Sequence, residues 1–196
     1  MKNILHTASL KYLFVLIITI SLIACEEKTY GGLALYTVRD AMAEDAAGTL
    51  KKVAGEGYKY IESAGYSEGT FYKLSPQDFK ELVLGLGLEP LSTHQATVTL
   101  ENADEMIADV KNAGFKYFVV PIPPMGMFTY NAQEQSMGMN GTAVQLANIL
   151  TELGKKCKAS DLELLYHNHD FEFREDGEGN VIIDYLLEHT DPEFVN

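Results

Sequence analysis

The stretch KYFVVPI, from Lys116 to Ile122, decides the fold of this chain. After the lysine it carries no charge and shows no alternation between apolar and polar positions. A strand of this kind has both faces buried, which is typical of a parallel sheet covered by helices. The residues before it fit this interpretation. Asn102 and Glu105 have the spacing of a helical capping box, and Gly114 is placed to end the helix that they predict.

The same order of strand, polar loop, helix and glycine recurs along the chain. Ser75 predicts the N-cap of another helix, with Pro76 at its first position. Apolar segments predict strands at 33–38, 60–66, 88–94, 116–122 and 162–167, and residues 191–196 predict the start of a sixth. Helices are expected near 47–55, 75–87, 102–114, 146–153 and 181–188, with a long loop at 121–140.

Strands that alternate with helices predict parallel βαβ units. An open doubly wound sheet is disfavoured, because no glycine-rich phosphate loop follows the first predicted strand. The remaining interpretation is an α/β fold, a (β/α)₈ TIM barrel, which at this spacing needs roughly 260 residues. The sequence covers about five βα units plus the start of strand six, so we expect an incomplete, C-terminally truncated barrel.

The N-terminal segment predicts export rather than folding. Residues 12–24 form a short apolar run preceded by Lys2 and Lys11, and no acid occurs before Glu26. The run ends in Leu-Ile-Ala-Cys, which resembles the lipobox of bacterial lipoproteins, with Cys25 as the lipidated residue. We therefore expect a signal peptide at 1–24, a tether at 25–32 and the partial barrel at 33–196. An ordinary signal peptide with a chance cysteine is the alternative.

Charge and cysteine content narrow the possible partners. The net charge is −13, and removal of residues 1–24 takes away two lysines and no acids, which leaves −15. Such a chain repels phosphate backbones, so we expect no nucleic-acid partner, and an endonuclease function is disfavoured. Cys157 is the only other thiol, and it predicts neither a disulfide framework nor a zinc site. We expect Cys157 to be a packing or surface residue.

Polar residues follow several predicted strands at the end where barrel active sites lie. Glu62 falls in the second strand, His94 ends the third, and His167, Asn168 and His169 end the fifth. A buried Glu62 needs a partner, which is either substrate, a neighbouring strand or Arg39. Each histidine is either a ligand of the site or a hydrogen-bonded residue at a strand end.

Four segments resemble the sugar phosphate isomerase/epimerase family, the xylose isomerase-like TIM-barrel superfamily. They are GLALYTVRD at 32–40, GYKYIESAGY at 57–66, LSTH at 91–94 and YHNHDFEF at 166–173. The resemblance covers essentially the whole mature chain in order. It implies a divalent metal (Mn, Mg, Zn or Co) at the carboxyl ends of the strands. Two metal-binding carboxylates would then move a proton next to a sugar carbonyl through an enediolate.

The chain departs from this family pattern at the fifth strand. His167 stands where many members have a metal-binding Glu, so the resemblance implies His167 as a metal ligand. Further ligands would lie after Asn196, and the catalytic acid and base are left unassigned. If the fifth strand continues, Glu172 shares a face with Asp170. Candidate substrate-binding residues are His169, His94, Glu62, Tyr36 and Arg39. For Tyr36 the alternative is core packing, and for Arg39 it is a surface role.

The sequence thus predicts a sugar isomerase/epimerase that transfers a proton next to the carbonyl of a sugar or keto-sugar with help from a metal. Its activity is expected to be compromised in a truncated chain. The alternatives are a keto-sugar lyase or dehydratase of the same fold, and a non-catalytic sugar-binding lipoprotein. The expected partners are a small carbohydrate and, through Cys25, a membrane. The expected location is the cell envelope, where a free or oxidised sugar is favoured over a sugar phosphate.

Overall fold

A parallel sheet of five strands organises the chain in the computed structural model, which describes residues 30–196. The order β1-β2-β5-β6-β9 follows the order in the sequence. The strands are β1 (Tyr30–Ala34), β2 (Tyr58–Ser63), β5 (Glu89–His94), β6 (Tyr117–Val120) and β9 (Glu163–Tyr166). The α/β fold and the parallel pairing are as predicted. The signal peptide, Cys25 and most of the predicted tether lie outside the described residues, and β1 begins inside that tether.

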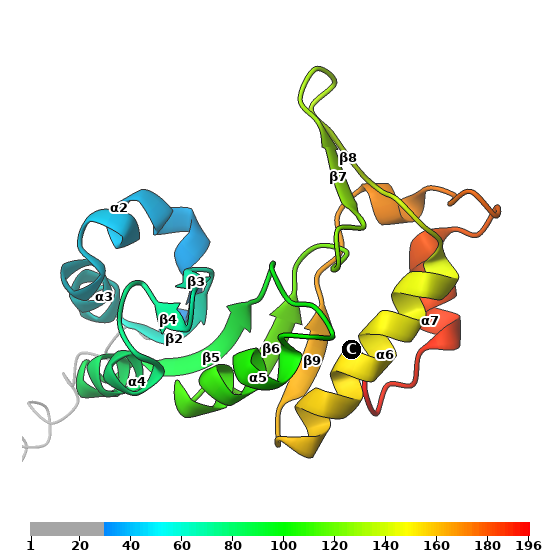
Figure 1. The fold of residues 1–196 in the computed structure, drawn as a ribbon. Coiled ribbons are helices and arrows are strands. Elements are labelled where there is room, and N and C mark those ends of the chain that lie inside the picture. The colour runs from blue at the N-terminus through cyan, green and yellow to red at the C-terminus, as the bar shows by residue number, and fades with distance from the viewer. Residues whose placement is uncertain (1–29) are drawn as a thin grey trace, which may run out of the picture.

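Helices flank one side of the strands, as Figure 1 shows for α4, α5 and α6 beside β5, β6 and β9. The helices of the described residues are α2 (Arg39–Glu44), α3 (Ala46–Gly55), α4 (Pro76–Gly85), α5 (Ala103–Asn112), α6 (Ala143–Ala159) and α7 (Ile182–His189). Phe118 and Leu164 point to these helices and are buried in one core with Phe79 and Leu150. Cys157 belongs to this core, where burial raises the pKa of its thiol to about 12, so its predicted packing role is confirmed. No helix among residues 30–196 is long and apolar enough to cross a membrane.

Two predicted segments differ from the structure. The first strand was expected to run to Val38, but the chain leaves the sheet after Ala34 and forms the 3-10 helix η1 (Leu35–Val38). Thr37 stabilises this turn, because its hydroxyl donates to the Ala34 carbonyl at 2.7 Å. The long loop at 121–140 contains an antiparallel hairpin, β7 (Phe128–Asn131) with β8 (Ser136–Met139), which projects beyond the carboxyl ends of the strands (Figure 1). A shorter pair, β3 (Tyr66–Ser67) and β4 (Thr70–Phe71), follows β2.

The helix caps were predicted in part. Ser75 accepts from the Asp78 amide, and Pro76 occupies the first turn of α4, as expected. The predicted capping box at Asn102 is wrong, since its side-chain oxygen accepts instead from the Thr99 amide in the preceding turn. A capping box does occur at α6, where Thr142 and Gln145 bond to each other's backbone.

After α7, the last described residue returns to the sheet beside β9. Residues 191–195 turn rather than extend, but Asn196 lies beside β9. Its amide donates to the Leu164 carbonyl at 3.1 Å, and its carbonyl accepts from the Tyr166 amide at 2.7 Å. A residue of a neighbouring parallel strand forms this same pair of backbone hydrogen bonds. The predicted sixth strand is therefore present as a single paired residue.

Asp176 connects the loop after η2 (Phe171–Phe173) to the start of α6. One carboxylate oxygen accepts from the Ala143 amide at 2.7 Å, and the other accepts from the Glu178 and Asn180 amides. These bonds hold the pKa of Asp176 down at about 2. The ionised carboxylate thus supplies a cap that α6 receives from a distant part of the chain.

We expect Asp176→Ala to lower the free energy of unfolding at pH 7 by about 1 kcal/mol, the typical value of a helix cap. The pKa of the folded state is depressed, so the contribution is complete above the ordinary aspartate pKa and is lost as the pH falls toward about 2. Urea denaturation at pH 7 and at pH 2.5 measures this. Glu178→Ala, in an exposed side chain, is the control. An equal loss of unfolding free energy in Asp176→Ala at both pH values would contradict the role of the ionised carboxylate as a helix cap.

Candidate functional site

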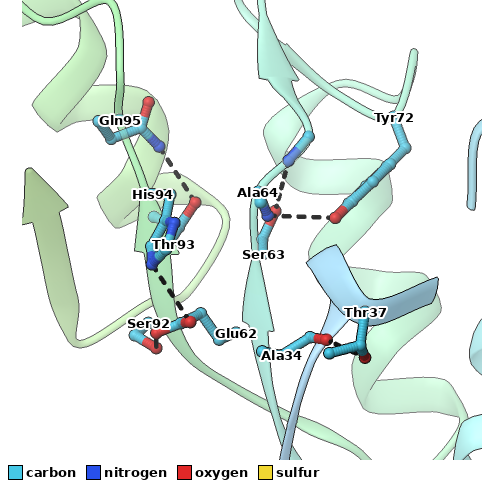
Figure 2. Close-up of polar contacts among 11 residues, drawn as sticks. Ala34, Thr37, Glu62, Ser63, Ala64, Tyr72, Ser92, Thr93, His94 and Gln95 are labelled. Carbon is cyan, nitrogen blue, oxygen red and sulfur yellow. Dashed lines mark hydrogen bonds and ion pairs between the residues drawn. The ribbon is translucent and has the colours of Figure 1, made fainter. Parts of the chain in front are cut away.

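Three polar side chains converge at the carboxyl ends of β2 and β5. Glu62 pairs with Ser92 across the two strands, and His94 lies two residues after Ser92. Because side chains alternate along a strand, Ser92 and His94 share one face of the sheet with Glu62. We call it the inner face, because it lies opposite the helix-covered face that carries Phe118. Figure 2 shows the Glu62 carboxylate between Ser92 and His94.

Glu62 is held by both neighbours. Its Oε2 accepts from the Ser92 hydroxyl at 2.7 Å, and its Oε1 lies 3.2 Å from Nε2 of His94. The imidazole of His94 holds the pKa of the Glu62 carboxyl below its ordinary value, and the Ser92 hydroxyl adds to this against the opposing effect of partial burial. The carboxylate is therefore ionised at neutral pH. Of the partners left open by the sequence, an inter-strand partner is the one observed, and Arg39 is not.

His167 approaches the same group from β9. Its amide continues the sheet by donating to the Val120 carbonyl at 3.0 Å. The rings of His167 and His94 meet edge to face, with centroids 5.1 Å apart. Partial burial lowers the pKa of His167, and the neighbouring imidazoles of His94 and His169 lower it further. His167 is thus a neutral imidazole at pH 7, with exposed surface on the inner face.

His169 and Glu172 complete the end of β9. The ring of His169 lies beside that of His167, with centroids 4.9 Å apart, and its buried Nδ1 has no hydrogen-bond partner among the described residues. Glu172 would have shared a strand face with Asp170 only if the fifth strand continued that far, and β9 ends at Tyr166. Glu172 lies instead in η2, where it is completely buried.

Tyr36 and Arg39 lie apart from this group. They belong to η1 and α2 rather than to a strand end, and Tyr36 is 60% exposed. The Arg39 guanidinium stacks over the Tyr36 ring at 4.9 Å and donates to the Tyr36 carbonyl. Within residues 30–196, no hydrogen bond or ion pair connects either residue to Glu62 or the histidines. The structure thus brings four of the predicted site residues together: Glu62, His94, His167 and His169.

The described residues do not form a metal centre by themselves. Residues 30–196 contain no group of three or more His, Cys, Asp or Glu side chains arranged to hold a metal ion. His167 offers one free imidazole, whereas Glu62 and His94 are already in contact with each other. A divalent ion at His167 therefore needs ligands beyond those that the described residues arrange.

The sequence did not single out Ser92 as a site residue, and it did not indicate that Glu172 is buried. Ser92 occupies the strand position before the last two residues of β5, and its parity with His94 was the available signal. Glu172 was noticed, but its burial depends on where β9 ends. No local pattern in DFEF signals the 3-10 turn that carries Glu172 inward.

The geometry defines a class of fold: a parallel barrel sheet with a polar site at the carboxyl ends of its strands. Solved structures of TIM-barrel proteins share this fold. A sugar phosphate isomerase/epimerase from Parabacteroides distasonis is 24% identical, with a TM-score of 0.66 over 86% of this chain and 67% of its own. The chain thus spans about two thirds of that structure. No protein-family model and no curated protein sequence matches the chain.

Two more distant structures share the fold. A xylose isomerase-like TIM-barrel protein from Mycobacterium smegmatis, in complex with magnesium, is 14% identical, with a TM-score of 0.53 over 87% of this chain and 63% of its own. A D-psicose 3-epimerase from Clostridium cellulolyticum is 12% identical, with a TM-score of 0.52 over 85% of this chain and 61% of its own. At these identities the likeness establishes the fold, and the predicted incomplete TIM barrel is confirmed.

Replacing His94 tests the electrostatics of the site. We expect His94→Gln to raise the pKa of Glu62, because the main cause that lowers it is removed while partial burial remains. A carboxyl-detected NMR titration of both proteins measures the shift. The pKa of Asp176, far along the chain, provides an internal reference that should stay unchanged. An unchanged Glu62 pKa would contradict the contact between the two side chains.

Proposed function

We propose that this chain contributes to the active site of a sugar isomerase or epimerase, which transfers a proton next to a carbonyl. The observation that carries the proposal is the Glu62–His94 contact beside the neutral His167 at the carboxyl ends of β2, β5 and β9. In barrels of this kind, this rim is where chemistry occurs. The sugar isomerases and epimerases that share the fold support the same general kind of function.

Each side chain of the site has its own proposed role. Glu62 is ionised, and its Oε1 lies 3.2 Å from Nε2 of His94, so the carboxylate fixes the orientation of that imidazole. An imidazole held by a carboxylate can take up a proton and return it, which is the step that isomerisation and epimerisation require. His169, whose ring lies beside that of His167, is assigned to substrate. A general acid or base of this type contributes roughly 10²- to 10⁴-fold to a rate.

A divalent ion at His167 is a separate part of the proposal. Such an ion stabilises the negative charge that develops on a carbonyl oxygen. Its support is the ligand character of a neutral imidazole and the magnesium complex of the Mycobacterium smegmatis protein. Elemental analysis of the purified full-length protein tests it, with His167→Ala as the comparison. Retention of the same metal content in His167→Ala would remove His167 from the ligand set.

A free or oxidised sugar fits the site better than a sugar phosphate. Among the described residues, no Lys or Arg contacts Glu62, His94 or His167, and Arg39 is turned toward Tyr36. The net charge of the chain also disfavours an anionic substrate. The substrate class proposed is therefore an uncharged ketose or aldose, or a keto-sugar derived from one.

Proton exchange with solvent tests the proposed reaction. We expect the full-length protein to introduce deuterium from D₂O next to the carbonyl of a ketohexose such as D-fructose, as followed by NMR. His94→Gln should slow this exchange on the order of 100-fold. His189→Gln is the matched control, because His189 stacks on Tyr185 at the end of α7. Sugar binding without exchange in the unsubstituted protein would favour a non-catalytic sugar-binding protein instead.

Anchoring at Cys25 is the proposed location signal. We propose that the mature chain is a cell-envelope lipoprotein, on the basis of the Leu-Ile-Ala-Cys sequence after the apolar run. Metabolic labelling with an alkyne fatty acid should mark the protein expressed in a bacterial host, and Cys25→Ser should abolish the label and release the protein from the membrane fraction. Labelling that persists in Cys25→Ser would count against this location.

A further inference from the structure

Glu172 is the one acidic side chain that has no exposed surface among the described residues. Burying a charge is costly unless hydrogen bonds compensate for the lost water. Both carboxylate oxygens are in fact used. Oε1 accepts from the Tyr166 hydroxyl at 2.7 Å, and Oε2 accepts from the backbone amide of His169 at 2.8 Å. The carboxylate therefore bridges the last residue of β9 and the turn that follows it.

The bridge spans the two histidines of the candidate site. Glu172 contacts Tyr166 and His169, and His167 lies between these two residues in the chain. The His167 amide donates separately to the Val120 carbonyl. The segment from Tyr166 to His169 is thus held at three points, the Tyr166 hydroxyl and the backbone amides of His167 and His169. The ring of His169 is then placed against His167 on one side and parallel to Phe171 on the other.

We propose that Glu172 is a positioning residue for this site. It acts through the backbone and ring of His169 and does not contact substrate, since its side chain is fully enclosed. This role rests on the proposed function, in which His167 and His169 border the substrate. A displacement of about 1 Å in such groups can cost on the order of 100-fold in rate.

Substitutions can separate hydrogen bonding from charge. Glu172→Gln keeps the shape and retains both contacts, because its amide oxygen can accept from His169 while its amide group donates to the Tyr166 hydroxyl, which can reverse its role. Glu172→Met has a similar volume but no acceptor. It leaves the Tyr166 hydroxyl and the His169 amide without their acceptor, which is destabilising for each donor left unpaired. Glu175→Gln, an exposed glutamate three residues later, is the matched control.

The test measures hydrogen–deuterium exchange of the His169 amide together with proton transfer on D-fructose. In Glu172→Met, we expect the His169 amide to exchange at least tenfold faster, while urea denaturation shows that the protein remains folded and circular dichroism shows unchanged secondary structure. Turnover should fall at least tenfold, with a much smaller change in KM. Glu172→Gln should restore both the protection and the turnover, and Glu175→Gln should leave them unchanged.

The results that overturn the proposal are equally definite. Full protection of the His169 amide in Glu172→Met would show that the bridge does not hold the turn. Loss in Glu172→Gln as large as in Glu172→Met would assign the effect to charge rather than to positioning. The amide measurement needs no activity. If the unsubstituted protein catalysed no exchange on sugars, the proposed function would fail while the exchange of the His169 amide still decided the role of Glu172 in holding the turn.

Discussion

The position of β5 between β2 and β6 is the constraint on which the site depends. β5 pairs on both edges in parallel register, which places Ser92 beside Glu62 and His94 beside Val119. β6 then pairs with β9, so that His167 extends from the next strand on the same face. A shift of one residue in β5 would send Ser92 and His94 to the helix-covered side. The apolar character of β6, buried on both faces, makes such a shift costly.

Glu62 and Glu172 differ in burial, and this difference gives them different roles. Glu62 is half-buried and faces the inner side of the sheet, where it contacts His94. Glu172 is enclosed, and its two hydrogen bonds go to residues of its own segment. One carboxylate therefore shapes the electrostatics of the inner face, while the other shapes the backbone that carries His167 and His169. The chemistry of the rim and the local structure of the β9 turn are supplied by different residues.

The repeating pattern of strands and helices could be predicted from the sequence because it depends on local signals. Apolar runs such as 116–122, the cap at Ser75 and the glycines after the helices gave the order of the elements and the parallel sheet. The meeting of Glu62, His94 and His167 followed from the rule that barrel sites lie at the strand ends. What failed depended on tertiary context. The strand ends at Ala34 and Tyr166 follow from turns whose stabilising contacts only the folded chain shows.

The central claim is that the ends of β2, β5 and β9 form one site for a sugar. It is tested most directly by side-chain NMR of the histidines during titration with D-fructose. The account predicts that the ring resonances of His94 and His167 shift together with a single dissociation constant, while those of His189 do not move. Shifts confined to one of the two rings, or absent from both at saturating sugar, would contradict it.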